Sequence, residues 1–420
     1  MRSKIISIGD ELLIGQIVNT NAAYLGEKLF SIGIPVERTV VISDEESVLL
    51  SELDDSVNNY DVTIITGGLG PTHDDITKPV IVKYFKDELI TDETVLAHVM
   101  KIFSDRKIKM PEINKGQALV PKNSEVIHNE SGTAPGIWIE NNGKIIIALP
   151  GVPYEMKSMI EGIILLKLKL FFKNKFKNVI KQKTLLTTGL GESTLNERLG
   201  DIKEIIEESK LAFLPSAEGV RLRINVTAEN EEDADKKINL IEFRIRKKAG
   251  EFVFGTNGER MEEVTGNILR ERKKTLSLAE SCTGGELSAR IVSIAGCSDY
   301  YMGGVCSYSN REKLKILGVK AETIENYGAV SEKTALEMAE GVRELMGTDF
   351  SLSTTGVAGP SGGSEEKPVG LVWIGFSSAE KTFAMKFNFG ERRDIIIRRA
   401  VMRALEILRR ELLSIEQNYY

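Results

Sequence analysis

Strand-like apolar segments alternate with amphipathic helical segments along two separate stretches of this chain, and this alternation limits its possible folds. In the first stretch, residues 4–8 and 61–66 are largely apolar, whereas residues 21–32 have the spacing of a helix with one apolar face. Strands that do not alternate in polarity are buried on both faces, as in a parallel sheet covered by helices. The pattern predicts a doubly wound α/β domain over residues 1–167.

The same alternation returns in the carboxyl-terminal part of the chain. Strand-like residues 275–279 and 350–355 flank helical residues 331–346, which predicts a second doubly wound α/β domain over residues 256–420. Residues 168–255 combine short strands with helices and predict a small α+β domain. The predicted fold class is therefore α/β, with two doubly wound domains joined by a small α+β middle domain.

The composition is that of a soluble globular protein. The 420 residues are 42% hydrophobic and 28% charged, and the net charge of −6 argues against bulk binding to nucleic acid. No apolar run reaches the roughly 18 residues that cross a bilayer. The amino terminus turns acidic after a short apolar run, which is unlike a signal peptide. The cysteines Cys282, Cys297 and Cys306 are odd in number, which favours reduced thiols and a cytoplasmic location.

Three loops with polar or glycine-rich sequences follow predicted strands of the first domain. They read GDELLIGQIVNTNA at 9–22, TGGLGPTHDDITKP at 66–79 and ALPGVPYEM at 148–156. The carboxyl ends of strands in an open α/β sheet converge on one crevice. Glycine-rich turns let backbone N–H groups approach a phosphate, and adjacent carboxylates can hold a divalent cation. These loops predict a site for a phosphate-bearing ligand.

The three loops closely resemble the amino-terminal domain of the CinA family, the competence/damage-inducible proteins, which is similar to the molybdopterin-binding proteins. The resemblance implies hydrolysis of ADP-ribose to AMP and ribose 5-phosphate with a divalent metal ion. A role in molybdopterin chemistry is the rival interpretation. The residues implied for the substrate are Gly67, Gly68 and Gly70, and those implied for the metal are Asp10, Glu11, Asp74 and Asp75.

The heptapeptide AESCTGG at 279–285 follows a predicted strand of the last domain and carries two possible nucleophiles. All three histidines of the chain lie in its first third, so a histidine base from the same domain is excluded. A lysine or a tyrosine is then the expected base. Ser281 is the favoured nucleophile. Cys282 could also act if the helix start lowered its pKa, although a buried packing role is favoured for it and for Cys297 and Cys306.

Two further stretches supply partners for this nucleophile. AGCSDYYMGGVCSYSNREK at 295–313 contains a strand predicted at 305–308, which ends at a tyrosine and is followed by a lysine. TTGVAGPSGGSEEKPVG at 354–370 is a glycine-rich loop after a strand, suited to a phosphate or a ribose. A serine with a lysine base and a tyrosine to relay the proton is a workable amidase set.

These stretches resemble the carboxy-terminal domain of CinA, the nicotinamide-nucleotide amidase family. The resemblance implies conversion of nicotinamide mononucleotide and water to nicotinate mononucleotide and ammonia, without a cofactor. The implied catalytic residues are Ser281, Tyr308 and Lys313, while Ser298 stays open as a second nucleophile or an oxyanion donor. The candidate substrate-binding residues are Thr283, Gly284, Gly285, Ser298, Asn310, Thr355, Gly356, Gly359, Arg392 and Arg393.

The middle region of the family looks like a KH-type fold. A KH domain that binds RNA needs a GxxG loop with basic flanks, and residues 180–255 contain none. A spacer or a dimer contact is the favoured role. The expected partners are small nucleotide substrates and a second copy of the chain in a homodimer, without nucleic acid or membrane. The alternative is a non-catalytic nucleotide- or molybdopterin-binding regulator linked to competence or the response to DNA damage.

Overall fold

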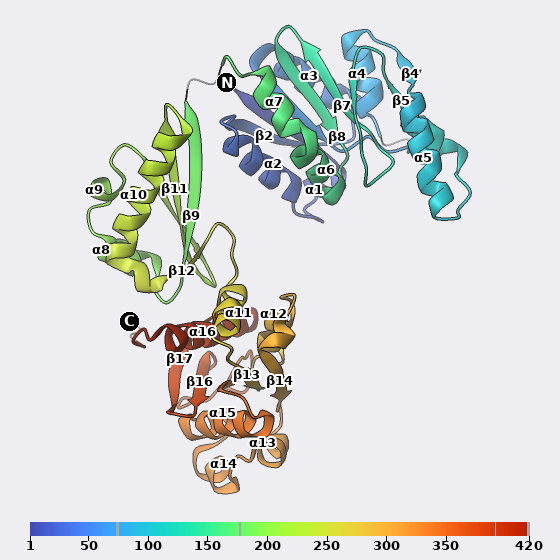
Figure 1. The fold of residues 1–420 in the computed structure, drawn as a ribbon. Helices are drawn as coiled ribbons and strands as arrows, with labels where there is room; N and C mark the ends of the chain where they lie inside the picture. Colours follow the sequence, from blue (N-terminus) through green and yellow to red (C-terminus); the bar gives the residue numbers. More distant parts are fainter. Residues whose placement is uncertain (73–74, 176–177, 391, 418–420) are drawn as a thin grey trace. The chain divides into compact units, whose positions relative to one another are not determined.

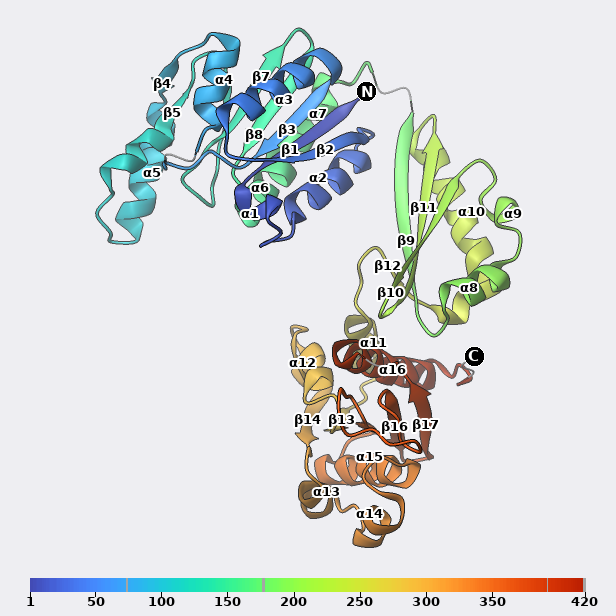
Figure 2. The ribbon, with the colours of Figure 1, turned by 180° about the vertical axis from the view of Figure 1, so that it is seen from behind.

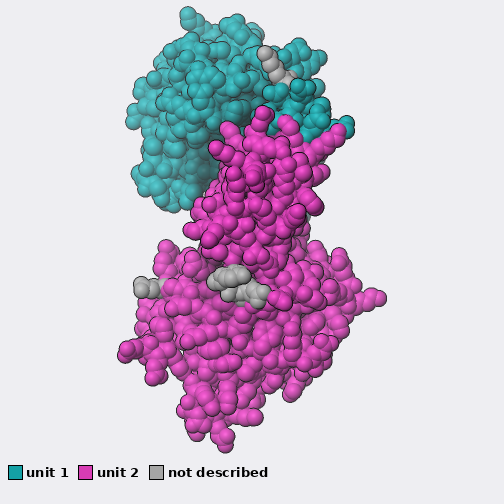
Figure 3. Space-filling model, turned by 90° about the vertical axis from the view of Figure 1, so that its left-hand side faces the viewer, with its two compact units in different colours: residues 1–181, 227–234 teal, residues 182–226, 235–420 magenta. Residues whose placement is uncertain are grey.

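The computed structural model describes residues 1–72, 75–175, 178–390 and 392–417 (Figures 1 and 2). The chain divides into two compact units, one of residues 1–181 with 227–234 and the other of residues 182–226 with 235–420 (Figure 3). No helix in the described ranges is long and apolar enough to cross a membrane.

The first unit is built on a six-stranded sheet with strand order β2-β1-β3-β8-β7-β6. The first four of these strands run parallel, and the other two pair antiparallel at one edge. The strands are β1 (Ser3–Ile8), β2 (Val36–Ile42), β3 (Val62–Thr66), β6 (Glu125–Ile127), β7 (Gly136–Asn141) and β8 (Lys144–Leu149), with a separate ribbon of β4 (Leu89–Thr91) and β5 (Leu119–Pro121).

Helices cover both faces of this sheet, as the continuous apolar strands predict. Ile5 and Ile64 pack toward α2, α6 and α7, whereas Ile6 and Ile65 pack toward α3 and α4. The chain leaves β1 for β2 on one side and returns through α3 to β3 on the other, so the loops after β1 and β3 open on one crevice. The helices are α1 (Asp10–Leu13), α2 (Thr20–Ser31), α3 (Glu46–Asn59), α4 (Thr77–Phe85), α5 (Glu93–Asp105), α6 (Pro153–Met159) and α7 (Leu165–Phe171), with a 3-10 helix at Glu112–Ala118 and a π-helical turn at Ile160–Ile164.

The middle region forms a four-stranded antiparallel sheet of order β10-β11-β9-β12, with helices on one side (Figure 1). Alternating residues of β11 are buried, and α10 buries Ala234, Ile238, Ile241 and Ile245 at helical spacing. Its elements are β9 (Val179–Thr187), α8 (Glu192–Leu199), α9 (Ile202–Ile206), β10 (Lys210–Ser216), β11 (Gly219–Ala228), α10 (Glu231–Ala249), a 3-10 turn (Gly250–Phe252) and β12 (Val253–Thr256).

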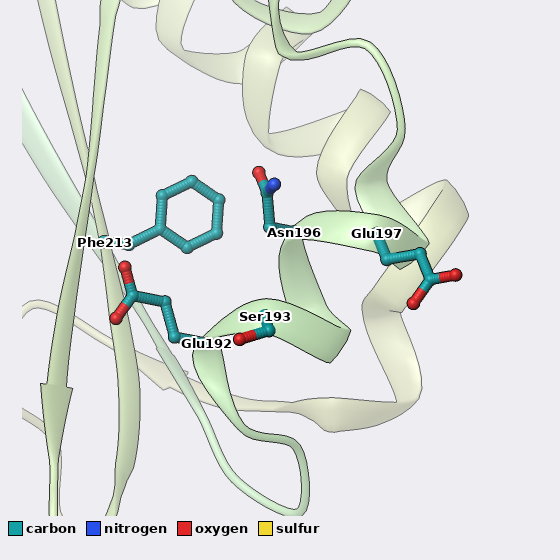
Figure 4. A pocket seen from close by; sticks show the side chains of 5 residues that line it. All are labelled: Glu192, Ser193, Asn196, Glu197 and Phe213. Carbon is teal, nitrogen blue, oxygen red and sulfur yellow. The ribbon is translucent and has the colours of Figure 1, made fainter.

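A small hollow lies between α8 and β10 of the middle region. Glu192, Ser193, Asn196 and Glu197 of α8 line one side and Phe213 of β10 the other (Figure 4), around a volume of about 450 Å³. Two of its five lining side chains are acidic and none is basic. This lining does not suit a nucleic-acid backbone, which needs positive charge.

The last domain is a five-stranded sheet of order β14-β13-β15-β16-β17, in which β14, β13 and β15 are parallel and the other two antiparallel. Helices α11, α12 and α16 lie on one face and α13, α14 and α15 on the other (Figures 1 and 2). The elements are α11 (Met261–Glu271), β13 (Leu276–Glu280), α12 (Glu286–Val292), a 3-10 turn (Cys297–Asp299), β14 (Tyr301–Cys306), α13 (Asn310–Leu317), α14 (Ala321–Tyr327), α15 (Glu332–Met346), β15 (Phe350–Gly356), β16 (Leu371–Ser378), β17 (Thr382–Asn388) and α16 (Arg393–Leu413).

Strand β14 differs from the prediction, because it runs over Tyr301–Cys306 rather than over residues 305–308. The two glycines inside it weakened the strand signal in the sequence. Gly304 has a physical reason to be there, since a Cβ at this position would lie 2.9 Å from the carbonyl oxygen of Leu278 on the neighbouring strand. Tyr308 consequently stands beyond the strand, in the loop before α13.

Candidate functional site

Ser281 and Lys313 meet at the carboxyl ends of the parallel strands of the last domain. Ser281 directly follows β13, and its N–H donates to Thr354 O on β15 at 3.0 Å. Lys313 lies on α13, whose start is capped by the side chain of Ser309. The Nζ of Lys313 is 2.9 Å from Ser281 Oγ and donates to Ser307 O at 2.6 Å. The structure thus brings the predicted nucleophile and the predicted base into hydrogen-bond contact.

The surroundings of Lys313 favour its neutral form. The residue is 1% exposed, and burial lowers the pKa of its amine, because removing the ammonium from water is unfavourable. No carboxylate among the described residues forms an ion pair with this amine. A neutral amine has a free electron pair, so Lys313 can accept the proton of Ser281.

Cys282 is held in a different environment from its neighbour. It is buried within the core that α12 and α16 share with the sheet, and burial raises the pKa of its thiol to about 12. The thiol therefore stays protonated at neutral pH and is a poor nucleophile. The packing role expected for Cys282 fits this environment, whereas Cys306 is exposed rather than buried, because β14 is an edge strand.

The carboxylate of Glu280 occupies the start of α12, where the sequence suggested a place for a substrate anion. It accepts hydrogen bonds from the N–H groups of Gly285, Leu287 and Ser288 and from the hydroxyls of Thr283 and Ser288. Free N–H groups at a helix start attract negative charge, and here the chain supplies it. Thr283 and Gly285 thus bind a side chain of the protein. Sequence reasoning missed Glu280, although an acid directly before a small-residue turn is the available signal.

Tyr308 lies apart from the Ser281–Lys313 pair in its contacts. It is 63% exposed, and its hydroxyl accepts a hydrogen bond from Arg393 at 3.2 Å. Arg393 also donates to Gly359 O at 2.8 Å. The structure therefore brings together three of the predicted residues, Tyr308, Gly359 and Arg393. Within the described ranges, Tyr308 forms no hydrogen bond with Ser281 or Lys313.

The other predicted residues of this domain have varied positions. Thr355 donates its hydroxyl to Ala329 O, and Arg392 pairs with Asp394. Asn310 is exposed at the start of α13, and Gly356 ends β15. Gly284 is exposed, and its N–H donates to Ser281 O.

Ser298 and Ser281 lie at opposite ends of the parallel strands. Ser298 belongs to the 3-10 turn that leads into the start of β14, and β14 runs parallel to β13. The structure therefore places Ser298 at the amino ends of these strands and Ser281 at their carboxyl ends. Ser298 does not join the Ser281–Lys313 pair.

The first domain has a cleft of about 800 Å³ at the carboxyl ends of its strands. All three predicted loops line it, and so does the loop after β2, which sequence reasoning missed. The predicted residues in its lining are Asp10, Glu11, Gly67, Gly68, Gly70 and Asp75, and the further polar ones are Ser43, Asp44, Glu45, Gln117, Thr133 and Glu155. The predicted Asp74, like His73, lies outside the described residues.

Asp75 organises the glycine-rich loop of this cleft. Its carboxylate accepts hydrogen bonds from the N–H groups of Gly70 and Thr72 and from the Thr72 hydroxyl. Gly67 and Gly68 both have positive φ, and the Thr77 hydroxyl donates to Gly67 O at 2.8 Å. The loop is thus held in a shape that glycine adopts more readily than other residues.

Several carboxylates line the cleft of the first domain and are possible ligands of a divalent metal. Among the described residues, no three acidic, histidine or cysteine side chains lie close enough together to hold a metal ion. Magnesium usually needs only one or two protein carboxylates when substrate phosphates complete its shell. Asp10, Glu11, Asp44 and Glu45 all line the cleft and have the hard oxygen donors that such an ion prefers. These residues fit an ion that binds together with a phosphate.

Comparisons with known proteins cover nearly the whole chain. A CinA-like protein of Kosmotoga olearia is 43% identical over 416 residues, which are 99% of this chain and 100% of that protein. A CinA-like protein of Salinibacter ruber is 41% identical over 414 residues, 98% of this chain and all of that protein. The chain belongs to the CinA family.

Three family descriptions match successive parts of this CinA-family chain. They are "Probable molybdopterin binding domain" over residues 4–169, "Damage-inducible protein CinA KH domain" over 182–255 and "CinA C-terminal domain" over 258–412. The crystal structure of the competence/damage inducible protein CihA from Agrobacterium tumefaciens is 37% identical. It covers 36% of this chain and 95% of its own, with a TM-score of 0.35. The sheets of the structure and the family descriptions confirm the fold class predicted from the sequence, which is two α/β domains with a KH-like middle domain.

Proposed function

We propose that the last domain is a serine amidase that converts nicotinamide mononucleotide and water to nicotinate mononucleotide and ammonia. The observation that carries this proposal is the contact between Ser281 Oγ and the buried amine of Lys313 at 2.9 Å. A hydroxyl beside a desolvated amine is an activated nucleophile, and a carboxamide is a substrate for it. The resemblance to the nicotinamide-nucleotide amidases supplies the identity of the substrate.

The reaction has two stages, which are acylation of Ser281 and hydrolysis of the acyl-enzyme. Lys313 takes the proton of Ser281 while the serine oxygen bonds to the carboxamide carbon. The carbon–nitrogen bond then breaks, the nitrogen takes the proton from Lys313, and ammonia leaves. Water releases the nicotinate product from the acyl-enzyme by the same route.

The turn after Ser281 is suited to stabilising the oxyanion of this reaction. The N–H groups of Cys282 and Thr283 stand next to the nucleophile, and neither donates to a backbone carbonyl among the described residues. Backbone donors at such a position stabilise the negative charge that develops on the substrate oxygen. Tyr308 and Arg393 are exposed beside the glycine-rich loop, where they could contact the ribose or phosphate part of the nucleotide.

A direct assay tests this proposal. The full chain is incubated with nicotinamide mononucleotide, nicotinamide riboside or nicotinamide, and the ammonia released is measured. We expect release from the mononucleotide above the other two compounds. Absence of ammonia with all three would contradict the amidase function and favour a non-catalytic regulator.

We further propose that the first domain hydrolyses ADP-ribose to AMP and ribose 5-phosphate. The cleft at the reversal of strand order supports this, because it combines a glycine-rich loop with acidic side chains. One or two of the carboxylates of Asp10, Glu11, Asp44 and Glu45 would hold a divalent metal together with the substrate phosphates, and the metal would supply charge neutralisation at the pyrophosphate when bound. The glycine loop would direct backbone N–H groups at the phosphates.

The test separates this activity from molybdopterin binding. AMP formation from ADP-ribose is measured with magnesium, manganese, cobalt or no added metal, after treatment with a chelator. We expect AMP only with a metal present. No AMP with any metal, together with tight binding of a pterin, would favour the molybdopterin alternative.

The proposal also includes the oligomeric state and the location of the protein. We expect a homodimer in the cytoplasm, where Cys282, Cys297 and Cys306 stay reduced, as they are in the structure. Light scattering on the purified protein measures the oligomeric state.

A further inference from the structure

The side chain of Ser307 is an unused polar group next to the candidate base. The residue is fully buried, and its hydroxyl has no hydrogen-bond partner among the described residues. Both backbone polar groups of Ser307 already have hydrogen-bond partners. The carbonyl accepts from Lys313 Nζ at 2.6 Å, and the N–H donates to Glu280 O at 2.8 Å. A buried polar group without a partner costs about 1–3 kcal/mol, so this hydroxyl calls for a physical explanation.

The number of donors on Lys313 provides one. A lysine ammonium has three N–H donors and no acceptor. Two of these directions are taken, one toward Ser281 Oγ and one toward Ser307 O. In the neutral amine the electron pair faces Ser281, one N–H faces Ser307 O and the second N–H needs an acceptor. When the amine takes the proton of Ser281 it becomes an ammonium, and an acceptor for that remaining N–H stabilises the charged form more than the neutral one. Ser307 Oγ belongs to the residue that already contacts the amine, and rotation about its Cα–Cβ bond reorients the hydroxyl without moving the backbone.

We propose that Ser307 is a positioning residue for Lys313, whose hydroxyl accepts the third N–H of the ammonium during the reaction. This inference rests on the proposed amidase function. The proton balance is simple: the proton of Ser281 moves to Lys313 Nζ and then to the departing nitrogen, while Ser307 keeps its own proton throughout. Ser307 therefore stabilises the charged intermediate form of the base.

Other groups near Lys313 do not provide this stabilisation. Cys282, after β13, and Cys306, at the end of β14, are the titratable groups that act on the Lys313 amine. Burial raises the pKa of the Cys282 thiol, and the partial loss of water around the Cys306 thiol raises its pKa as well. They are therefore neutral at physiological pH. The carboxylate of Glu280 is bound by the turn at residues 283–288. The positive charge of the Lys313 ammonium is therefore stabilised by hydrogen bonds to neutral oxygens, and Ser307 Oγ is one of these.

The experiment compares Ser307→Ala and Ser307→Thr with the matched control Ser351→Ala. Ser351 is also fully buried, but its hydroxyl donates to Ala339 O at 2.6 Å. Two quantities are followed against pH: kcat and KM with nicotinamide mononucleotide, and the rate at which a fluorophosphonate labels Ser281, read by mass spectrometry. The labelling rate depends on the basicity of Lys313 but does not require hydrolysis of the nucleotide.

We expect the acid limb of both pH profiles to move about one pH unit lower in Ser307→Ala. Loss of one hydrogen bond to a charged group corresponds to about that shift, because the ammonium becomes harder to form. We also expect kcat to fall about tenfold with KM unchanged, a wild-type profile in Ser307→Thr, and no shift in Ser351→Ala. A purely structural role would lower the amount of folded protein without moving the limb.

The outcomes separate this inference from the proposed function. Labelling of Ser281 that shifts in Ser307→Ala, without ammonia from the nucleotide, would uphold the role of Ser307 and reject the substrate. Hydrolysis of the nucleotide with an unshifted limb in Ser307→Ala would reject the role of Ser307 and keep the function. If Ser307→Ala fails to fold, Ser307→Cys decides, since its thiol is a weaker acceptor of similar size, and a wild-type limb there would overturn the inference.

Discussion

The amine of Lys313 lies 2.9 Å from the hydroxyl of Ser281, although the two residues are on different elements of the last domain. Parallel strands β13 and β14 end side by side, so the turn after one and the helix after the other meet at the same edge of the sheet. The contact is therefore a consequence of the sheet topology.

Removal of either member of this pair should abolish the amidase reaction. We expect Ser281→Ala and Lys313→Ala to lower kcat by about 10³-fold or more, since a nucleophile and its base act as a unit. Lys313→Arg should be equally inactive, because a guanidinium does not give up its proton. Lys315→Ala, an exposed lysine on the same helix, is the control and should keep full activity. Ammonia release measures all four, and an active Ser281→Ala variant would reject the serine mechanism.

The activity should rise with pH through the pKa of Lys313. Burial lowers this pKa below the usual lysine value of about 10.4, and only the neutral amine can accept a proton. The free energy of unfolding changes with pH in the same direction as the activity, because the unfolded chain binds this proton more tightly than the folded chain does. Stability should therefore rise with pH between the folded and unfolded pKa values, and Lys313→Met should lose that rise. Urea unfolding at several pH values measures it, and parallel curves for the two proteins would contradict it.

Replacement of Glu280 by glutamine should loosen the turn that carries Ser281. The buried carboxylate accepts five hydrogen bonds. A glutamine amide has only one oxygen acceptor, and its two N–H groups would face some of the N–H and hydroxyl groups that now donate to the carboxylate. We expect a loss of roughly 3 kcal/mol in the free energy of unfolding. Glu286→Gln is the control, since Glu286 makes only a 3.4 Å pair with Arg290 at the surface and should cost under about 0.5 kcal/mol. Equal stability of the two variants would disprove the role given to Glu280.

In the first domain, Gly68→Ala should disturb the glycine-rich loop. Gly68 has a φ of 65°, and a Cβ there would lie 2.4 Å from the Thr77 hydroxyl. Gly143→Ala is a close match, because Gly143 has a φ of 74° but no atom within 4 Å of the added Cβ. Both variants bear the backbone strain of about 1 kcal/mol, and only Gly68→Ala should also lose hydrolysis of ADP-ribose. Wild-type turnover in Gly68→Ala would contradict the assignment of this loop to the substrate.

The fold was largely predictable because its signals are local. Continuous apolar strands and amphipathic helices predicted both α/β domains, and the residues Ile396, Ala400 and Ala404, which share one face of α16, are fully buried. Strand β14 was misplaced because Gly304 serves close packing against Leu278, which lies on a neighbouring strand from a distant part of the chain.

The sites were predictable only where a residue acts through its type and its place at a strand end. The serine, the lysine and the glycine loops have such signals. For the role of Glu280 at the start of α12, the adjacent small residues are the only sequence signal. The role depends on which N–H groups the turn leaves free, and these are set by the folded backbone. The contact between Tyr308 and Arg393 joins residues 85 positions apart, because the loop before α13 meets the start of α16.

The carboxylate at the start of α12 has a consequence for inhibition. Many nucleotide enzymes are inhibited by inorganic phosphate or sulfate that settles on a vacant helix start. In this protein the N–H groups of Gly285, Leu287 and Ser288 already hold Glu280. These N–H groups are therefore not available to a free anion, and inhibition by phosphate or sulfate at this helix start is not expected.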